Sequence, residues 1–459
     1  MKVYDWVIVG GGAQGIYAAA LLAKKGKKIA LIERSNGLGG VLRGKRHNDL
    51  NLDFGCHVFN NDKADITALT LEIMRDEYIP LSVKYASITN NHLCEGIAVP
   101  DFSWLDKEAQ KAALNQIKDN ALIHKITQNE AFNLEETLNN RYGSDLAQYL
   151  SNIVLKLAAN NNTHDLDPSA LLRTPLSRVH LMDDDDNIVS NLKNSSKEID
   201  AILALPSQND EMKYYQDAKK SFVHRTFYPK KNGMRGFCDL AEKYLEKVGV
   251  DLFLGETVES IKETKNNSIK TFLKDSDILI SEKLIWALDQ GALSKILWGE
   301  DAMINHVAKI PMALFYFFMD KDDQPSYTYV HDFTPESWVF RASSPGFYGQ
   351  QSNSKGQSYI CAECVTEMSS DLWKSPDKYK NKIWEELNKM GMIVKTEWQE
   401  AYTLSTPVSY SMFKVGYEQV LARISNKLDE DYPNVLNLNI NAYAKNGLIE
   451  AISEKLENI

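Results

Sequence analysis

A glycine-rich loop near the start of the chain has the residue types and spacing needed to hold a phosphate: Gly10-Gly-Gly-Ala-Gln-Gly15. The first glycine of such a loop permits a tight turn, the second fixed glycine lets the backbone approach a pyrophosphate, and the last lets the next helix pack closely on its sheet. The N-terminus of that helix then stabilises the negative charge. We therefore predict that five residues of the loop contact a dinucleotide: Gly10, Gly12, Ala13, Gln14 and Gly15.

Three predicted elements position this loop. Residues 6–9 form a short apolar strand, residues 16–23 an apolar helix, and residues 28–32 a second strand that ends at Glu33. A carboxylate at that place can accept hydrogen bonds from both ribose hydroxyls of the adenosine half, and it would repel a 2'-phosphate. Because the strands, the helix and the acidic residue accompany the glycines, the pattern indicates a complete βαβ dinucleotide-binding unit.

The segment that follows indicates FAD rather than NAD. Glu33-Arg34 is followed by Gly37-Leu-Gly-Gly40 and then by Leu52-Asp-Phe-Gly-Cys-His-Val-Phe59. These motifs resemble the superfamily that contains flavin amine oxidases, protoporphyrinogen oxidases, phytoene desaturases and UDP-galactopyranose mutases. The resemblance implies that one set of residues lies along the ribityl and phosphate region of FAD: Arg34, Gly39, Gly40, Val41 and Leu42. It also implies that a second set lies near the isoalloxazine ring: His57, Val58 and Phe59.

Two further segments resemble the same families. The run 228–236 leads into a helical pattern and a strand, like the return of the chain to the FAD domain, where Val258 would touch the adenine through its backbone. The run 434–452 resembles the closing strand and helix. Many members have Gly-Asp where this chain has Ile-Asn441, so an asparagine would replace the usual carboxylate. Backbone amides at the start of the last helix could stabilise negative charge on a reduced flavin, namely those of Gly447, Leu448 and Ile449.

The fold implied is α/β, with a Rossmann-like FAD-binding domain, a helical cap and an antiparallel-sheet substrate domain. We expect the FAD-binding domain to contain residues 1–75, 228–292 and 415–459, and the substrate-binding and cap domain to contain residues 76–227 and 293–414. The first part of the substrate domain has helical patterns with few glycines. Its second part has strand-like apolar runs at 313–319 and 358–365.

Two residues are candidates for catalysis. The motif would place His57 beside the flavin, where it could act catalytically or donate a hydrogen bond to a backbone carbonyl. Arg341, with Glu363 and Tyr410, could face a pocket opposite the ring, or it could be an exposed arginine or part of an internal ion pair.

Other reactive side chains have simpler interpretations. Arg225 and Arg235 could clamp a phosphate-bearing substrate, although solvated surface arginines are commoner. Cys361 and Cys364 would point to opposite faces of a strand, and no helix start follows to lower a thiol pKa, so we expect no redox pair. The acidic run 183–186 lacks a spaced set of further ligands, and no metal is predicted.

Composition excludes several classes of partner. The net charge of −10 is spread along the chain without a basic stripe, which argues against nucleic acid and against an anionic membrane surface. Five cysteines without a framework spacing and the lack of a signal-peptide pattern favour a cytoplasmic protein. The most apolar stretch, residues 310–319, is about half as long as a membrane span requires, so we expect a buried strand.

Three functions fit these observations. The first is an FAD-dependent oxidoreductase that transfers a hydride from a small-molecule substrate to flavin N5, in sugar-nucleotide or polysaccharide metabolism. The second is a non-redox isomerase like UDP-galactopyranose mutase, which uses reduced FAD on a sugar nucleotide. The 55–59 motif suits such a mutase, but the His that precedes Ile-Gly-Gly in those enzymes is missing from the 37–40 segment. The third is a flavin-binding protein without turnover.

Overall fold

The computed structural model describes residues 2–61, 64–127, 131–183, 187–205, 226–274, 277–393, 397–438 and 445–457. The chain folds into two units, each built from separated segments. Unit 1 comprises Met1–Leu81, His224–Asn305 and Glu418–Ile459, and unit 2 comprises Ser82–Val223 and His306–Tyr417.

Unit 1 is organised around a sheet with the strand order β10-β2-β1-β13-β12-β11, and β19 pairs with β13. Five strands run parallel: β1 (Val3–Val9), β2 (Ile29–Glu33), β10 (Asp251–Leu254), β13 (Ile278–Trp286) and β19 (Val435–Asn437). Two are antiparallel: β11 (Val258–Glu263) and β12 (Ile269–Leu273). All five residues of β2 are buried, as expected for a parallel strand covered on both faces. The predicted α/β fold is confirmed.

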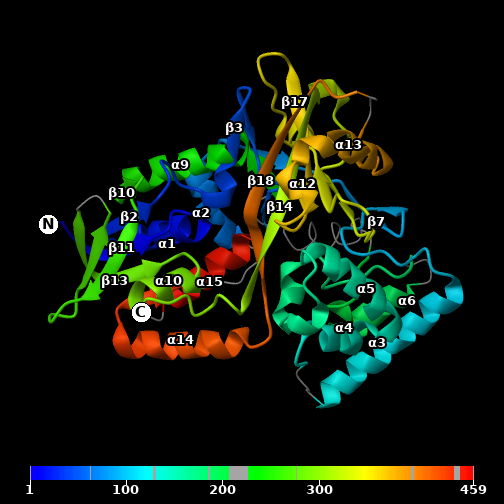
Figure 1. The fold of residues 1–459 in the computed structure, drawn as a ribbon, viewed down its shortest axis with the longest axis horizontal. Coiled ribbons are helices and arrows are strands. Elements are labelled where there is room, and N and C mark those ends of the chain that lie inside the picture. Colours follow the sequence, from blue (N-terminus) through cyan, green and yellow to red (C-terminus); the bar gives the residue numbers. More distant parts are fainter. Residues whose placement is uncertain are drawn as a thin grey trace. The chain divides into compact units, whose positions relative to one another are not determined.

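Helix α1 (Ala13–Lys24) begins directly at the glycine loop, three residues before the predicted start. Its buried face contains Ala18, Ala19 and Ala20, whose small side chains allow close packing. α1 packs against α9 and α15 (Figure 1). The other helices of unit 1 are α2 (Ala64–Met74), α9 (Gly233–Lys247), α10 (Gln290–Trp298), α14 (Tyr417–Asp431) and α15 (Lys445–Glu457). Short ladders are β3 (Lys45–His47) with β4 (Leu50–Leu52), and β5 (Phe59–Asn60) with β9 (Thr226–Pro229) and β6 (Tyr78–Leu81).

Unit 2 contains a sheet with the order β18-β14-β17-β16-β15-β7-β8. Its strands are β7 (Tyr85–Thr89), β8 (His92–Glu95), β14 (Val307–Asp320), β15 (Tyr329–Asp332), β16 (Arg341–Ser343), β17 (Gln357–Val365) and β18 (Glu400–Phe413). All neighbours are antiparallel except β7 and β15. One face is apolar, because Phe315 and Phe317 of β14 pack with Trp384 of α13 (Lys380–Lys389). The predicted antiparallel sheet and the strands at 313–319 and 358–365 are confirmed.

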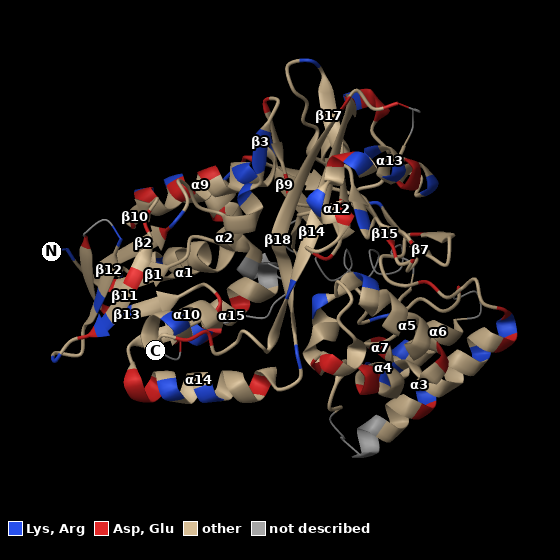
Figure 2. Cartoon of the chain, viewed as in Figure 1, with Lys and Arg blue, Asp and Glu red and all other residues tan. Residues whose placement is uncertain are grey.

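The rest of unit 2 is largely helical, as the sequence predicted. Figure 1 shows α3 (Lys107–Thr127), α4 (Leu134–Tyr142), α5 (Ser144–Leu157) and α6 (Ile188–Ser195) gathered together, and α7 (Lys197–Asp200) follows α6. Acidic and basic residues are interspersed along α3, α9 and α14 (Figure 2). Among the described residues, no helix is both long and apolar enough to cross a membrane.

Candidate functional site

In unit 1 the glycine-rich loop joins the end of β1 to the start of α1. Gly10 has a φ of +106°, a value that glycine adopts without strain. A Cβ on Gly15 would lie 1.8 Å from the carbonyl oxygen of Gly10, so no side chain fits there. A Cβ on Gly12 would meet no atom of the described residues within 4 Å, which leaves its surroundings open to a ligand. Helix α1 begins at this open place, so the positive end of its dipole lies there.

Glu33 ends β2 beside the loop and is only 8% exposed. Its Oε2 accepts a hydrogen bond from the Gly11 amide at 2.8 Å, and its Oε1 accepts one from the Ser35 amide at 2.8 Å. Two backbone donors therefore hold the carboxylate in one orientation. Because each carboxylate oxygen can accept more than one hydrogen bond, both oxygens can also accept one from a ribose hydroxyl.

The second glycine turn lies against the first one. The Gly39 amide donates to the carbonyl of Gly11 at 2.7 Å, and a Cβ on Gly40 would lie 3.4 Å from Cα of Gly12. Leu42 is buried, whereas Val41 is 55% exposed and Arg34 is exposed as well. The side chain of Leu42 thus anchors the turn. The structure brings the two predicted glycine motifs into one backbone surface.

Ion pairs to α9 hold the second turn in place. Oε1 of Glu242 accepts hydrogen bonds from the Leu38 amide at 2.7 Å and from Nη1 of Arg43 at 2.6 Å. Nη2 of Arg43 lies 3.2 Å from Oδ1 of Asp239. The Arg43 side chain is 19% exposed, so this network is shielded from solvent more than a surface ion pair. Neither Arg43 nor Glu242 was predicted, and both act by positioning the turn.

Asp53 is a second positioning residue that was not predicted, although it lies in the quoted 52–59 motif. It is fully buried, and its carboxylate accepts hydrogen bonds from the Tyr228 hydroxyl, from the Met234 amide at 3.1 Å and from Nδ2 of Asn51 at 3.0 Å. Met234 belongs to the first turn of α9, so the carboxylate caps this helix. A Cβ on Gly233 would lie 2.7 Å from Oδ1 of Asp53, which explains the glycine.

The 57–59 segment leads into β5. Phe59 is 1% exposed, and the centroid of its ring lies 5.3 Å from that of Phe227 and 4.9 Å from that of Phe237. Phe59 therefore belongs to the core and anchors the residues before it. His57 and Val58 are partly exposed, so both are accessible to a ligand. Their contact with a flavin stays a prediction.

The remaining predicted cofactor residues lie in β11 and α15. Val258 is 8% exposed and begins β11, opposite Leu273 of β12. α15 begins at Lys445, so Gly447 lies in its first turn, whereas Leu448 and Ile449 are its fourth and fifth residues and have buried side chains. Contact of these three residues with a flavin stays a prediction. Asn441 and Arg225 lie outside the described residues.

The sheet of unit 2 has a polar face, opposite its apolar one. Side chains alternate along a strand, and Ala342 and Val330 belong to the apolar cluster, so their neighbours point the other way. Strand register then places four polar residues in one row across four adjacent strands: Ser87, His331, Arg341 and Glu363. Ser343 is two residues beyond Arg341 and shares this face. We call these five residues the polar row.

Arg341 and Glu363 form an internal ion pair within the polar row. Nε of Arg341 lies 2.5 Å from Oε1 of Glu363, and Nη2 lies 2.8 Å from Oε2. The two side chains are 16% and 3% exposed. Of the interpretations given for Arg341, the internal ion pair matches this geometry. A catalytic role for Arg341 stays a prediction.

Three members of the polar row were not predicted, namely Ser87, His331 and Ser343, and His331 is the only titratable one among them. Its Nδ1 lies 3.0 Å from the carbonyl oxygen of Ala98, so this nitrogen carries the proton and Nε2 has a free electron pair. Burial, together with the charge of Arg341, lowers its pKa to about 3. His331 Nε2, Ser87 Oγ and Ser343 Oγ are buried and have no hydrogen-bond partner among the described residues. The row therefore holds buried polar atoms without a partner among the described residues, and it has no net charge.

Tyr410, Arg235 and the two cysteines of β17 were the other candidates. The Tyr410 hydroxyl donates to the carbonyl of Leu157. Arg235 is partly exposed in the first turn of α9. Neither Cys361 nor Cys364 forms a disulfide with another described residue. Cys364 lies in the apolar cluster, where burial raises its pKa well above the usual value. A buried, protonated thiol of this kind is a poor nucleophile.

Comparison of sequences identifies the N-terminal dinucleotide-binding segment but little beyond it. Residues 8–70 match the family described as NAD(P)-binding Rossmann-like domain. Glutathione reductase of Schizosaccharomyces pombe is 51% identical over 40 residues, which is 9% of this chain and 9% of that protein. FAD-dependent oxidoreductase dbaF of Emericella nidulans is 44% identical over 60 residues, 13% of each chain. The matches thus span about a tenth of the length of each relative.

Solved structures resemble the whole chain. A protein described as a protoporphyrinogen oxidase, from Exiguobacterium sp. 255-15, has a TM-score of 0.66 at 14% identity, covering 100% of this chain and 98% of that one. Reduced UDP-galactopyranose mutase has a TM-score of 0.70 at 13% identity, with 100% and 95% covered. Putrescine oxidase bound to putrescine has a TM-score of 0.63 at 14% identity, with 100% and 99% covered. The resemblance seen in the sequence motifs is therefore confirmed in the fold.

Proposed function

We propose that this chain is an FAD-dependent oxidoreductase whose unit 1 binds the cofactor and whose unit 2 contributes to substrate binding. One observation carries the proposal. The glycine loop at 10–15 and the glycine turn at 37–40 form one continuous backbone surface, joined by the hydrogen bond between Gly39 and Gly11 and bordered by the oriented carboxylate of Glu33. A surface of this kind suits an adenine dinucleotide whose pyrophosphate lies on glycines and whose ribose meets an acid.

The residues of unit 1 would divide the work of binding FAD. The N-terminus of α1 stabilises the pyrophosphate, and Glu33 accepts hydrogen bonds from the ribose. Arg43, Glu242 and Asp53 act indirectly, because they fix the second glycine turn and the start of α9. The bound cofactor would supply the hydride acceptor. The protein needs then to orient the substrate and exclude water.

The polar row suggests a class of substrate. Its ion pair is internally neutral and its histidine is uncharged at neutral pH, so it presents hydrogen-bonding atoms rather than a net charge. A hydroxyl-bearing small molecule can donate to Nε2 of His331 and exchange hydrogen bonds with Ser87 and Ser343. We therefore propose substrates rich in hydroxyl groups, sugar nucleotides included. His57 and Arg341 are the catalytic candidates that this proposal retains.

The test begins with the flavin of the purified protein. We expect an oxidised flavin band near about 450 nm, either as purified or after loading with FAD. A protein that stays colourless after loading would contradict the proposal. Anaerobic addition of NADH and NADPH then separates the mechanisms. If the band persists, NADH and NADPH do not reduce the flavin, which supports an enzyme reduced by its own substrate. If the band bleaches rapidly, the flavin accepts electrons from a nicotinamide, which favours the mutase-like isomerase.

A further inference from the structure

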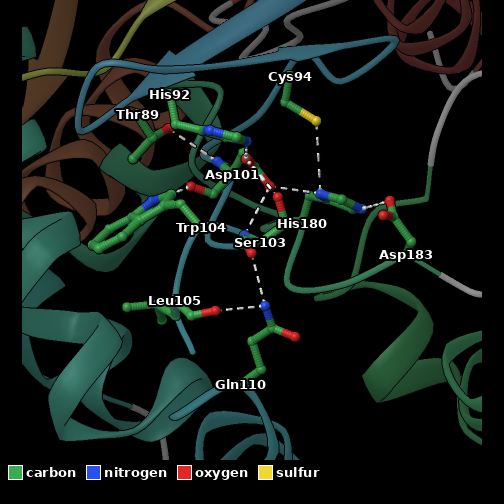
Figure 3. A network of polar contacts seen from close by, with 10 residues as sticks. All are labelled: Thr89, His92, Cys94, Asp101, Ser103, Trp104, Leu105, Gln110, His180 and Asp183. Atoms are coloured by element: carbon green, nitrogen blue, oxygen red, sulfur yellow. Dashed lines mark hydrogen bonds and ion pairs between the residues drawn. The ribbon is translucent and has the colours of Figure 1, made fainter. Parts of the chain in front are cut away.

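A cluster of metal-ligating side chains lies in unit 2 at the end of the polar row, where Cys94 of β8 is paired with Ser87 of β7. Figure 3 shows the side chains of Cys94, Asp101 and His180 pointing toward one another, with His92 beside them. The side chains of Asp101 and His180 are fully buried, and Cys94 is partly buried. Nothing in the proposed oxidoreductase chemistry uses these residues.

Strand geometry brings the donors together. His92 and Cys94 are two residues apart in the edge strand β8, so their side chains share one face. Asp101 and His180 form a parallel β-bridge, in which the Phe102 amide donates to the His180 carbonyl at 2.8 Å and the His180 amide donates to the Pro100 carbonyl at 2.9 Å. The backbone therefore fixes the imidazole next to the carboxylate before any ligand binds.

The distances between the donor atoms are close to those of a tetrahedral site. Nδ1 of His180 lies 4.0 Å from Sγ of Cys94 and 2.6 Å from Oδ1 of Asp101, and Nε2 of His92 lies 3.7 Å from Oδ2 of Asp101. Zinc bonds of about 2.3 Å to sulfur and about 2.0 Å to nitrogen or oxygen place tetrahedral donors about 3.3 to 3.6 Å apart. The distances among Cys94, His180 and Asp101 are thus each within about 0.8 Å of the ligated value. His92 faces the other oxygen of Asp101, so its side chain must turn to bind the same ion.

A catalytic Cys-His-Asp triad does not fit the same atoms. In a triad the nucleophile and the acid face opposite nitrogens of the imidazole. Here both Cys94 and Asp101 face Nδ1 of His180. Burial, with the nearby charge of Asp101, also raises the pKa of Cys94 to about 12, which leaves the thiol protonated and a poor nucleophile when no cation is present.

The second nitrogen of His180 supplies an independent observation. Nε2 is buried, has no hydrogen-bond partner among the described residues and faces Oδ1 of Asp183 at 3.9 Å. If Nδ1 donates its proton to Asp101, Nε2 has no proton to offer this carboxylate. If a metal occupies Nδ1, the proton moves to Nε2, and Asp183 becomes the carboxylate partner that metal-bound histidines usually have.

We propose that Cys94, Asp101, His180 and His92 form a structural zinc site. A thiolate, two imidazoles and a carboxylate make a closed four-ligand set of the kind that binds Zn²⁺. Binding releases the Cys94 proton to solvent and breaks the hydrogen bond from His180 to Asp101, whose carboxylate also accepts bonds from the amide and hydroxyl of Ser103. This proposal replaces the expectation from sequence that the chain holds no metal.

The site would connect two parts of unit 2. His92 and Cys94 lie on the edge strand of the sheet, whereas Phe102, Val179 and Leu181, next to the other ligands, pack into the core of the helical part. Because an edge strand is bonded on one side only, a metal bridge would restrain the β7–β8 hairpin against the helices. We therefore assign the metal to stability rather than to turnover.

The experiment uses the full-length chain, reduced and stripped of metal by a chelator. Titration with Co²⁺ should produce a thiolate-to-cobalt charge-transfer band that saturates at one equivalent and disappears when Zn²⁺ is added. Zinc should also raise the melting temperature. The absence of a saturable charge-transfer band in the wild-type chain would overturn the proposal, and this measurement depends on no variant.

Variants then assign the ligands. Cys94→Ser should abolish the band, and His92→Ala and Asp183→Asn should each weaken Zn²⁺ affinity about 10- to 100-fold. Cys361→Ala and His164→Gln are matched controls in the same unit, and both should retain full affinity. Circular dichroism checks that each variant folds. Equal zinc affinity in Cys94→Ser and the wild type would refute the site, and unchanged affinity in His92→Ala would refute the fourth ligand.

Discussion

Replacing Glu33 with Gln tests the proposed cofactor site most directly, because the two side chains have nearly the same shape. The carboxylate accepts hydrogen bonds from two backbone amides, those of Gly11 and Ser35. A carboxamide has one accepting oxygen, so its NH₂ group must face one of these two donors. Loss of the charge also weakens the hydrogen bonds from the ribose hydroxyls. Hydrogen bonds to charged groups contribute about 1.5 to 3 kcal/mol each.

We expect Glu33→Gln to weaken FAD binding by about 2 to 3 kcal/mol, which corresponds to an increase in Kd of about 30- to 150-fold. The assay is titration of the deflavinated protein with FAD, followed by quenching of flavin fluorescence. Glu246→Gln is the matched control, since Glu246 is an exposed residue of α9 in the same unit, and its Kd should be unchanged. A Kd for Glu33→Gln within twofold of the wild type would refute the placement of the ribose at Glu33.

Three further predictions concern the loop and the buried bases of unit 2. Gly12→Ala should fold normally but bind FAD weakly, because its Cβ enters the open space. Gly15→Ala should lose both folding and binding, because its Cβ would overlap the Gly10 carbonyl. Melting temperature and flavin content distinguish the two outcomes. Lys156→Met should lower the free energy of unfolding by about 3 kcal/mol, because the three N–H groups of the ammonium are shared among three carbonyls and the Ser337 hydroxyl, all within hydrogen-bond distance. Burial lowers the pKa of Lys156 to about 8, so the folded state binds fewer protons than the unfolded state between pH 8 and the pKa of an unfolded lysine, about 10.4. The free energy of unfolding of the wild type should therefore rise with pH through this window relative to the variant. A difference in free energy that does not change with pH would contradict the burial of the charge. His331→Phe removes a base whose folded pKa is about 3, so the wild type should lose stability relative to the variant as the pH falls from about 6.5, by at most about 1.4 kcal/mol per pH unit in chemical denaturation.

The cofactor side of the molecule could be predicted from sequence because its constraints fall on single residues. Gly10 needs a positive φ and Gly15 has no room for a Cβ, so each position shows its requirement in its own residue type. The β1–α1–β2 unit followed from these glycines, with an error of three residues at the start of α1. β14 and β17 followed in the same way from long apolar runs.

The supporting contacts could not be predicted because they join distant segments. Arg43 and Glu242 are 199 residues apart, and Asp53 and Tyr228 are 175 residues apart. A charged residue in a single sequence has the same appearance whether it is solvated or paired, and the partner is known only once the fold is known. The cluster of Cys94, Asp101 and His180 was missed for the same reason: its members have no compact spacing, and a β-bridge brings Asp101 and His180 together.

The polar row explains why no acid or base stands out in the sequence. Its charged members neutralise each other, since Arg341 is paired with Glu363, and the positive charge of Arg341 also lowers the pKa of His331. A row built in this way stays uncharged overall near neutral pH, and it can orient a hydroxyl group through Nε2 of His331 without removing its proton, because so weak a base cannot hold that proton. This property suits a reaction in which the cofactor accepts the hydride and the protein only aligns the donor carbon. Substrate selection would then depend on the spacing of hydrogen-bonding atoms in the polar row.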